Sequence, residues 1–134
     1  MNAVFADTSF YQALLNSRDR WHSAARALSR ELRRPVITSE YVLCEPGALM
    51  SRGTLRPLFL ELVRELDAAR QVEIVHASHN HFLAGKNVFA DRSDKSWSLT
   101  DCISFVIMQE HNIVEALTTD HHFQLAGFRS LLLT

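Results

Sequence analysis

Cysteine and glycine are scarce in this sequence, and their scarcity limits the chemistry that the chain can carry. The two cysteines, Cys44 and Cys102, have a spacing that matches neither a disulfide framework nor a cysteine metal site. We therefore expect a reducing, cytoplasmic location. The four glycines are dispersed, so the glycine-rich first turn of a dinucleotide-binding domain is missing.

Long apolar runs and an excess of one charge are also missing. No apolar run approaches the length of a membrane span, and Asp7 comes too early for a signal peptide, so we expect no membrane association. The formal net charge is −1, and no overall basic field would attract nucleic acid. Binding of RNA would need a local basic patch and bound metal ions.

What the sequence does contain is a regular alternation of short apolar runs and helical segments. With 134 residues and 47% hydrophobic side chains, the chain fits one compact domain, residues 1–134. The periodicity predicts strands at 3–6, 35–38, 72–76, 115–119 and 130–133, and helices at 9–16, 19–33, 40–52, 55–69, 79–90, 98–111 and 121–126. This alternation favours an α/β fold with a parallel sheet covered by helices on both faces.

Three aspartates stand where a predicted strand or loop meets a helix. Asp7 and Asp120 each follow a strand, and a helix cap is the simpler interpretation of either one alone. Asp101 ends the tetrapeptide Ser98-Leu99-Thr100-Asp101, which has the form of a capping box. Asp101 taken alone could equally be a helix cap or a functional carboxylate.

Glu45 is harder to explain by local structure. Its neighbours at helical spacing are Tyr41, Val42, Ala48 and Leu49, so we expect its carboxylate on an apolar helix face. An ionised side chain is costly there unless it is paired or coordinated. Glu45 therefore calls for a partner.

A shared location would explain these four carboxylates better than four separate roles. Ligands of open α/β sheets bind outside the carboxyl ends of the strands, near the point where the strand order reverses. If the strands before Asp7 and Asp120 are central neighbours, these side chains meet there, within reach of Asp101 and Glu45. Clustered carboxylates repel one another, and a divalent cation that prefers oxygen ligands, Mg²⁺ or Mn²⁺, removes that conflict. The pattern therefore predicts a metal site.

Four stretches around these carboxylates carry a family resemblance. They are FADTSF, ITSEYVLCE, DKSWSLTDCISF and ALTTDHHFQLAGF, and their order and spacing extend through nearly the whole chain. The set resembles the PIN domain, specifically the compact stand-alone kind found as VapC-type toxins. This resemblance implies an α/β/α sandwich with a central parallel sheet and a magnesium-dependent endoribonuclease activity.

The resemblance also implies roles for single residues and partners. Metal ligation falls mainly on Asp7 and Asp101, with the other two carboxylates completing the catalytic site. Ser9 and Thr119 match polar positions beside this site. Their hydroxyls could either contact the substrate or form a local hydrogen bond to the backbone. The implied partners are RNA, a cognate antitoxin of a type II toxin–antitoxin pair and a second copy of the chain in a homodimer.

Two local features bear on this interpretation. Pro46 follows Glu45 inside a predicted helix and disfavours helical geometry at the preceding residue, so we expect the helix to kink or restart there. The histidines lack the companions and spacing of a zinc site, and we expect surface or packing roles for them. For His121 and His122, beside Asp120, a minor role near substrate stays open.

Other functions of doubly wound sheets fit less well. A receiver domain needs an acidic pair near the first strand and a lysine after a late strand, but the only lysines are Lys86 and Lys95. A haloacid-dehalogenase-type enzyme needs an acid at the position of Ser9. The serious alternative is a PIN-like module that binds RNA or a protein without cleavage.

Overall fold

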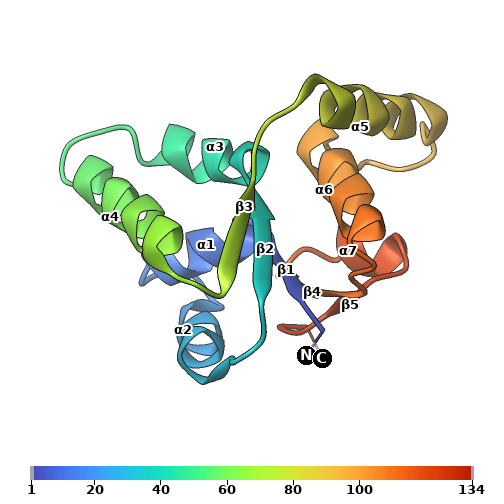
Figure 1. Ribbon diagram of the computed structural model, residues 1–134. Helices are drawn as coiled ribbons and strands as arrows, with labels where there is room; N and C mark the ends of the chain where they lie inside the picture. Colours follow the sequence, from blue (N-terminus) through green and yellow to red (C-terminus); the bar gives the residue numbers. More distant parts are fainter. Residues whose placement is uncertain (1, 134) are drawn as a thin grey trace.

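The computed structural model describes residues 2–133 and places a five-stranded sheet between two layers of helices (Figure 1). The strands are β1 (Val4–Ala6), β2 (Val36–Ser39), β3 (Val72–Val75), β4 (Glu115–Leu117) and β5 (Arg129–Ser130). The helices are α1 (Thr8–Leu15), α2 (His22–Glu31), α3 (Glu40–Leu49), α4 (Leu55–Ala68), α5 (His79–Asp91), α6 (Leu99–Glu110) and α7 (His122–Leu125). Each predicted element has a counterpart, and the largest difference is in the last strand, which was predicted at 130–133 and is found at Arg129–Ser130. Within residues 2–133, no helix combines the length and apolar character needed to cross a bilayer.

The strands run parallel throughout, in the order β3-β2-β1-β4-β5. The central strand, β1, pairs with β2 at Val4–Val36 and with β4 at Phe5–Ala116. The chain proceeds from β1 to β2 and β3 in one direction and then to β4 and β5 in the other. The strand order therefore reverses between β1 and β4, where open α/β sheets bind their ligands. The prediction of a parallel α/β/α sandwich is confirmed.

Helices cover both faces of the sheet. Figure 1 shows α1, α2 and α4 on one side and α5, α6 and α7 on the other, while α3 contacts α1, α4 and α6. All three residues of β1 are fully buried. In β4, Ala116 is fully buried and Leu117 is almost fully buried. Burial on both faces explains why these strands are continuous apolar runs in the sequence.

Close packing fixes α6, which carries Asp101 in its first turn, against α5. A Cβ atom at Gly85 would lie 2.3 Å from Ile103 Cγ1 and 3.0 Å from Ile103 Cα. Only glycine permits this approach of the two helices.

Aromatic packing then fixes α7 against α6. Phe105 makes edge-to-face contacts with Phe123 at 5.0 Å and with Trp97 at 5.1 Å between ring centroids. Phe123 is fully buried. This anchoring determines the position of the preceding residue, His122, relative to Asp101.

Candidate metal centre

The four carboxylates line one cavity at the carboxyl edge of the sheet. The cavity has a volume of about 280 Å³ and is bounded by Asp7, Thr8, Ser9, Gln12, Glu45, Ser96, Ser98, Asp101, Asp120 and His122. Its walls come from the starts of α1 and α6, the middle of α3, and the segment that joins β4 to α7. The folded chain therefore collects acidic side chains from distant parts of the sequence, as the pattern predicted.

Asp7 is almost completely buried, with 3% of its surface exposed. It caps α1 by accepting the Ser9 amide at 3.4 Å on Oδ2. The same oxygen accepts hydrogen bonds from the hydroxyls of Ser9 and Thr118, each at 2.9 Å. The Thr8 backbone amide also forms a hydrogen bond to this carboxylate.

Burial raises the pKa of Asp7 to about 6. The hydroxyls of Thr118 and Ser9 oppose this increase in pKa, and the charge of Asp101 adds to it. Without a cation, the folded protein therefore favours the ionised form of Asp7 less than an exposed aspartate would. A bound cation would reverse that preference.

The sequence left two roles open for Asp101, and the structure shows that it both caps α6 and lines the cavity. It forms a capping box with Ser98, whose Oγ accepts the Asp101 amide at 3.0 Å, while Asp101 Oδ2 accepts the Ser98 amide at 3.1 Å. Burial raises the pKa of Asp101, and the charge of Asp120 adds to this effect. Hydrogen bonds from the Ser98 amide and from His122 lower the pKa of Asp101.

Asp120 is more accessible, with 30% of its side chain exposed. Its Oδ1 accepts the amide of His122 at 2.9 Å, and its own amide donates to Thr118 Oγ1 at 3.0 Å. Thr118 is fully buried and joins Asp120 to Asp7 through one hydroxyl. Thr118 therefore orients two of the site's residues.

The structure gives Thr119 a smaller part than Thr118. Thr119 contributes its backbone amide, which donates to Ser9 Oγ at 2.9 Å, and it is absent from the cavity wall. The predicted strand ended at residue 119, whereas β4 ends at Leu117. A substrate contact for the Thr119 side chain stays a prediction.

Glu45 reaches the cavity from α3, but the expectation of an apolar face around it is wrong. Its side chain is exposed, and so are Ala48 and Leu49 one turn later. Because α3 lies over the edge of the sheet and not flat on it, this face meets water. Glu45 therefore needs no buried partner.

Of the two possibilities expected at Pro46, a restart is not found, because α3 is one helix that contains Pro46, and a kink stays a prediction. Proline cannot supply the amide that Val42 O would otherwise accept. Thr8 Oγ1 donates to this carbonyl oxygen at 3.3 Å, and Met50 N donates to Pro46 O at 2.9 Å. A hydroxyl from α1 thus substitutes for the missing helical donor.

His122, for which the sequence left a minor role near substrate open, lies on the cavity wall. Its Nδ1 lies 3.3 Å from Asp101 Oδ2 and 3.2 Å from Asp120 Oδ1. His121 has the expected surface position, with 70% of its side chain exposed. His122 is more buried, with 20% of its side chain exposed. The adjacency of His122 to Asp120 in the sequence was the available signal.

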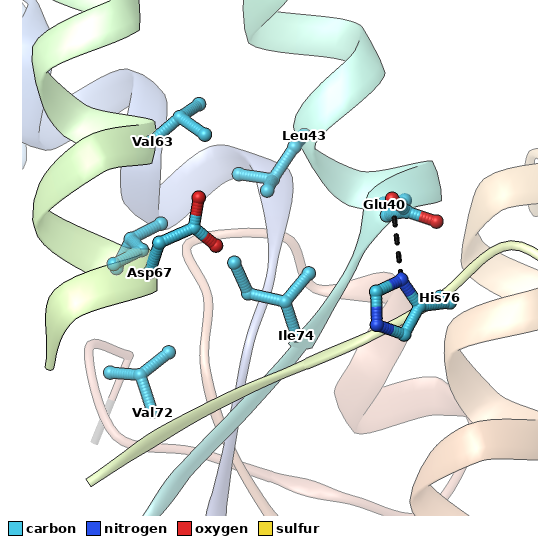
Figure 2. A pocket seen from close by; sticks show the side chains of 8 residues that line it. Glu40, Leu43, Val63, Asp67, Val72, Ile74 and His76 are labelled. Atoms are coloured by element: carbon cyan, nitrogen blue, oxygen red, sulfur yellow. Dashed lines mark ion pairs between the residues drawn. The ribbon is translucent and has the colours of Figure 1, made fainter. Parts of the chain in front are cut away.

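Another cavity, of about 320 Å³, lies between α3, α4 and β3 (Figure 2). Its wall is largely apolar and includes Leu43 and Ile74. Its ionisable groups are Asp67 and the pair formed by Glu40 and His76, whose oxygen and nitrogen are 3.6 Å apart. This lining lacks buried carboxylates, so the acidic cavity is the candidate metal centre.

Comparisons with known proteins agree with this geometry. The PIN domain model matches residues 4–129. The 23S rRNA-specific endonuclease VapC20 of Mycobacterium tuberculosis is 28% identical over 127 residues, which cover 93% of this chain and 95% of that protein. The crystal structure of M. tuberculosis VapC20, described as a sarcin-ricin loop cleaving toxin, has a TM-score of 0.84 at 26% identity and covers 93% of this chain and 95% of that one.

More distant relatives share the fold. FitAcB from Neisseria gonorrhoeae has a TM-score of 0.65 at 13% identity over 95% of both chains. DNA-bound VapBC from Salmonella typhimurium has a TM-score of 0.62 at 12% identity over 97% of both chains. With a family match over nearly the whole sequence and the carboxylates gathered at the strand-order reversal, this chain belongs to the PIN-domain family and is of the compact VapC type.

Proposed function

We propose that this protein is a metal-dependent endoribonuclease that hydrolyses RNA phosphodiester bonds, and that it is the toxin of a type II toxin–antitoxin pair. The observation that carries this proposal is the single cavity lined by Asp7, Glu45, Asp101 and Asp120. The 23S rRNA-specific activity in the name of VapC20 supports RNA as the substrate class.

The donor set of the cavity fits a divalent cation. Asp7 and Asp101 are buried carboxylates with raised pKa values, and carboxylate oxygens are the ligands that Mg²⁺ and Mn²⁺ prefer. Asp7 and Asp101 would hold the ion, with Asp120 and Glu45 completing the site directly or through water. When bound, such an ion lowers the pKa of a coordinated water and offsets charge on the phosphate.

The chain's own residues supply orientation. Ser9 donates to Asp7 and accepts the Thr119 amide, which favours a positioning role for its hydroxyl over direct contact with RNA. Ser96 and Gln12 on the cavity wall offer neutral polar groups for the RNA backbone. With a formal net charge of −1, the protein has no general field for RNA, so the cation provides the main attraction for a phosphate.

Partners follow from the relatives by analogy. VapBC of Salmonella typhimurium and FitAcB of Neisseria gonorrhoeae share the fold of this chain. We therefore propose that a cognate antitoxin protein inhibits the enzyme, that the chain forms a homodimer and that it acts in the cytoplasm, where its RNA substrate is present.

Cleavage of end-labelled RNA tests the proposal. A preparation containing 23S rRNA should be cut with Mg²⁺ or Mn²⁺ and left intact with EDTA. Asp7→Asn and Asp101→Asn should each reduce the rate at least about 100-fold, because each removes a charged group that acts on the reacting phosphate. The matched control is Asp91→Asn, which changes an exposed aspartate outside the cavity and should leave the rate unchanged.

Two results would count against the enzyme. Full cleavage by the Asp7→Asn, Asp101→Asn double variant would show that the cavity is not the active site. RNA binding without metal-dependent cleavage would favour the non-cleaving binding module.

A further inference from the structure

His122 places one imidazole nitrogen between two carboxylates of the cavity. Nδ1 lies 3.3 Å from Asp101 Oδ2 and 3.2 Å from Asp120 Oδ1. Ligands that are each about 2.1 Å from a shared ion lie about 3.0 Å apart in an octahedron and about 3.4 Å apart in a tetrahedron. His122 Nδ1 therefore has the spacing of a neighbouring metal ligand from each of these two carboxylate oxygens.

We propose that His122 is a nitrogen ligand of the cation in this cavity, and that the centre binds Mn²⁺ in preference to Mg²⁺. The inference rests on the proposed function, because it assigns a further ligand to the same metal site. Mn²⁺ shares the preference of Mg²⁺ for carboxylate oxygens but accepts an imidazole nitrogen more readily than Mg²⁺ does. A single nitrogen in the ligand set thus changes which ion the cavity selects.

The other ring nitrogen of His122 supports this assignment. Nε2 lies 3.4 Å from Ser96 Oγ. A ligating histidine usually donates its second ring N–H to an oxygen, and this bond fixes both the tautomer and the ring orientation. With the proton on Nε2, Nδ1 is left with a lone pair beside the two carboxylates and can bind a cation there.

The backbone holds the ring in this position. The His122 amide donates to Asp120 Oδ1 at 2.9 Å, and the next residue, Phe123, is fully buried against Phe105. Only 20% of the His122 side chain is exposed. The imidazole is therefore oriented before any ion arrives, which reduces the entropy lost on binding.

His121 provides a matched control on the same turn. The ligating atoms of Asp120, His121 and His122 all lie within 4.8 Å of one another. However, His121 Nδ1 is 3.8 Å from Asp120 Oδ1 and its side chain is 70% exposed, whereas the ion pair with Asp101 is made by His122. We assign His122 and not His121 as the ligand.

The test is pulsed electron paramagnetic resonance of the full chain with one equivalent of Mn²⁺. Wild type should show ¹⁴N modulation from a single imidazole. His122→Gln should bind Mn²⁺ without this modulation, and His121→Gln should retain it. His122→Asn serves as a second variant, and circular dichroism melting verifies that each variant is folded.

Calorimetric titration provides a second readout. His122→Gln should weaken Mn²⁺ binding about 10-fold, within the range found for changes around metal ligands, and should change Mg²⁺ binding less than about twofold. Asp7→Asn should weaken the binding of both ions.

The outcomes separate the two proposals. Bound Mn²⁺ without ¹⁴N modulation, or modulation lost only in His121→Gln, would overturn the role of His122 while metal-dependent RNA cleavage stands. Absence of any Mn²⁺ binding, together with RNA cleavage that persists in EDTA, would overturn both this inference and the proposed function.

Discussion

Thr8 donates a hydrogen bond from its hydroxyl to the carbonyl oxygen of Val42 at 3.3 Å, and this carbonyl is the one that Pro46 leaves without a helical donor. Both Thr8 and Val42 are buried. The contact joins the start of α1, next to Asp7, to the turn of α3 that carries Glu45. It thus sets the separation of these two carboxylates across the cavity.

Thr8→Val should therefore destabilise the protein by about 1–3 kcal/mol, because the Val42 carbonyl is left buried without a partner. Urea denaturation measures this loss. In a Pro46→Ala background, residue 46 supplies an amide to the same carbonyl, so Thr8→Val should cost much less. Equal costs in the two backgrounds would show that the hydroxyl does not compensate for the proline.

Thr118→Val should raise the pKa of Asp7 further above 6. The Thr118 hydroxyl donates to Asp7 at 2.9 Å and lowers the pKa of that carboxyl. Hydrogen bonds to charged groups contribute about 1.5–3 kcal/mol, so the pKa should rise by about one unit or more. Carboxyl ¹³C NMR of the metal-free protein measures it. The neighbouring Thr119→Val should leave this pKa unchanged, and an equal rise in both variants would contradict the assignment.

Asp7 should make the metal-free protein less stable as the pH rises. The pKa of Asp7 is about 6 in the folded chain and 3.8 for an ordinary aspartate, so the stability present below pH 3.8 is lost progressively as the pH increases to about 6. This pKa difference corresponds to about 3 kcal/mol. Asp7→Asn lacks the ionisation.

The free energy of unfolding in EDTA should therefore favour Asp7→Asn over wild type by a larger margin at pH 7.5 than at pH 4. Adding Mn²⁺ at pH 7.5 should stabilise wild type more than the variant, because the ion binds the ionised carboxylate. A margin that does not change with pH would refute the role of burial at Asp7.

Gly85→Val should destabilise the chain by about 3 kcal/mol or more, because the new side chain would overlap Ile103 on α6. Urea denaturation again measures the change. Asn87→Val, at an exposed position of the same helix, should cost only the small helix-propensity difference. Similar losses for the two variants would show that the α5–α6 contact tolerates a larger residue.

Much of the fold was predictable because its strands are buried on both faces. Runs such as Val4–Ala6 then differ clearly from the amphipathic helices between them. Asp7 and Asp120 were predictable as site residues because parallel strands bring their carboxyl ends to one edge, and the motifs around them match the family.

The remaining features depend on contacts that periodicity does not contain. The exposure of Glu45 follows from the placement of α3 over the sheet edge, which leaves Leu49 in water. The continuity of α3 depends on Thr8, which lies far away in the sequence. The position of His122 depends on aromatic packing of Phe123 against Phe105. None of these pairings leaves a periodic signal in the sequence.

The pairing of β1 with β4 also governs when the protein becomes active during its own synthesis. A ribosome adds Asp7 more than a hundred residues before Asp120, and Thr118 cannot bond to Asp7 until that late segment has emerged. A nascent chain therefore lacks one wall of the acidic cavity until this segment has been made. The proposed nuclease would therefore have no complete site until residues 118–120 have emerged.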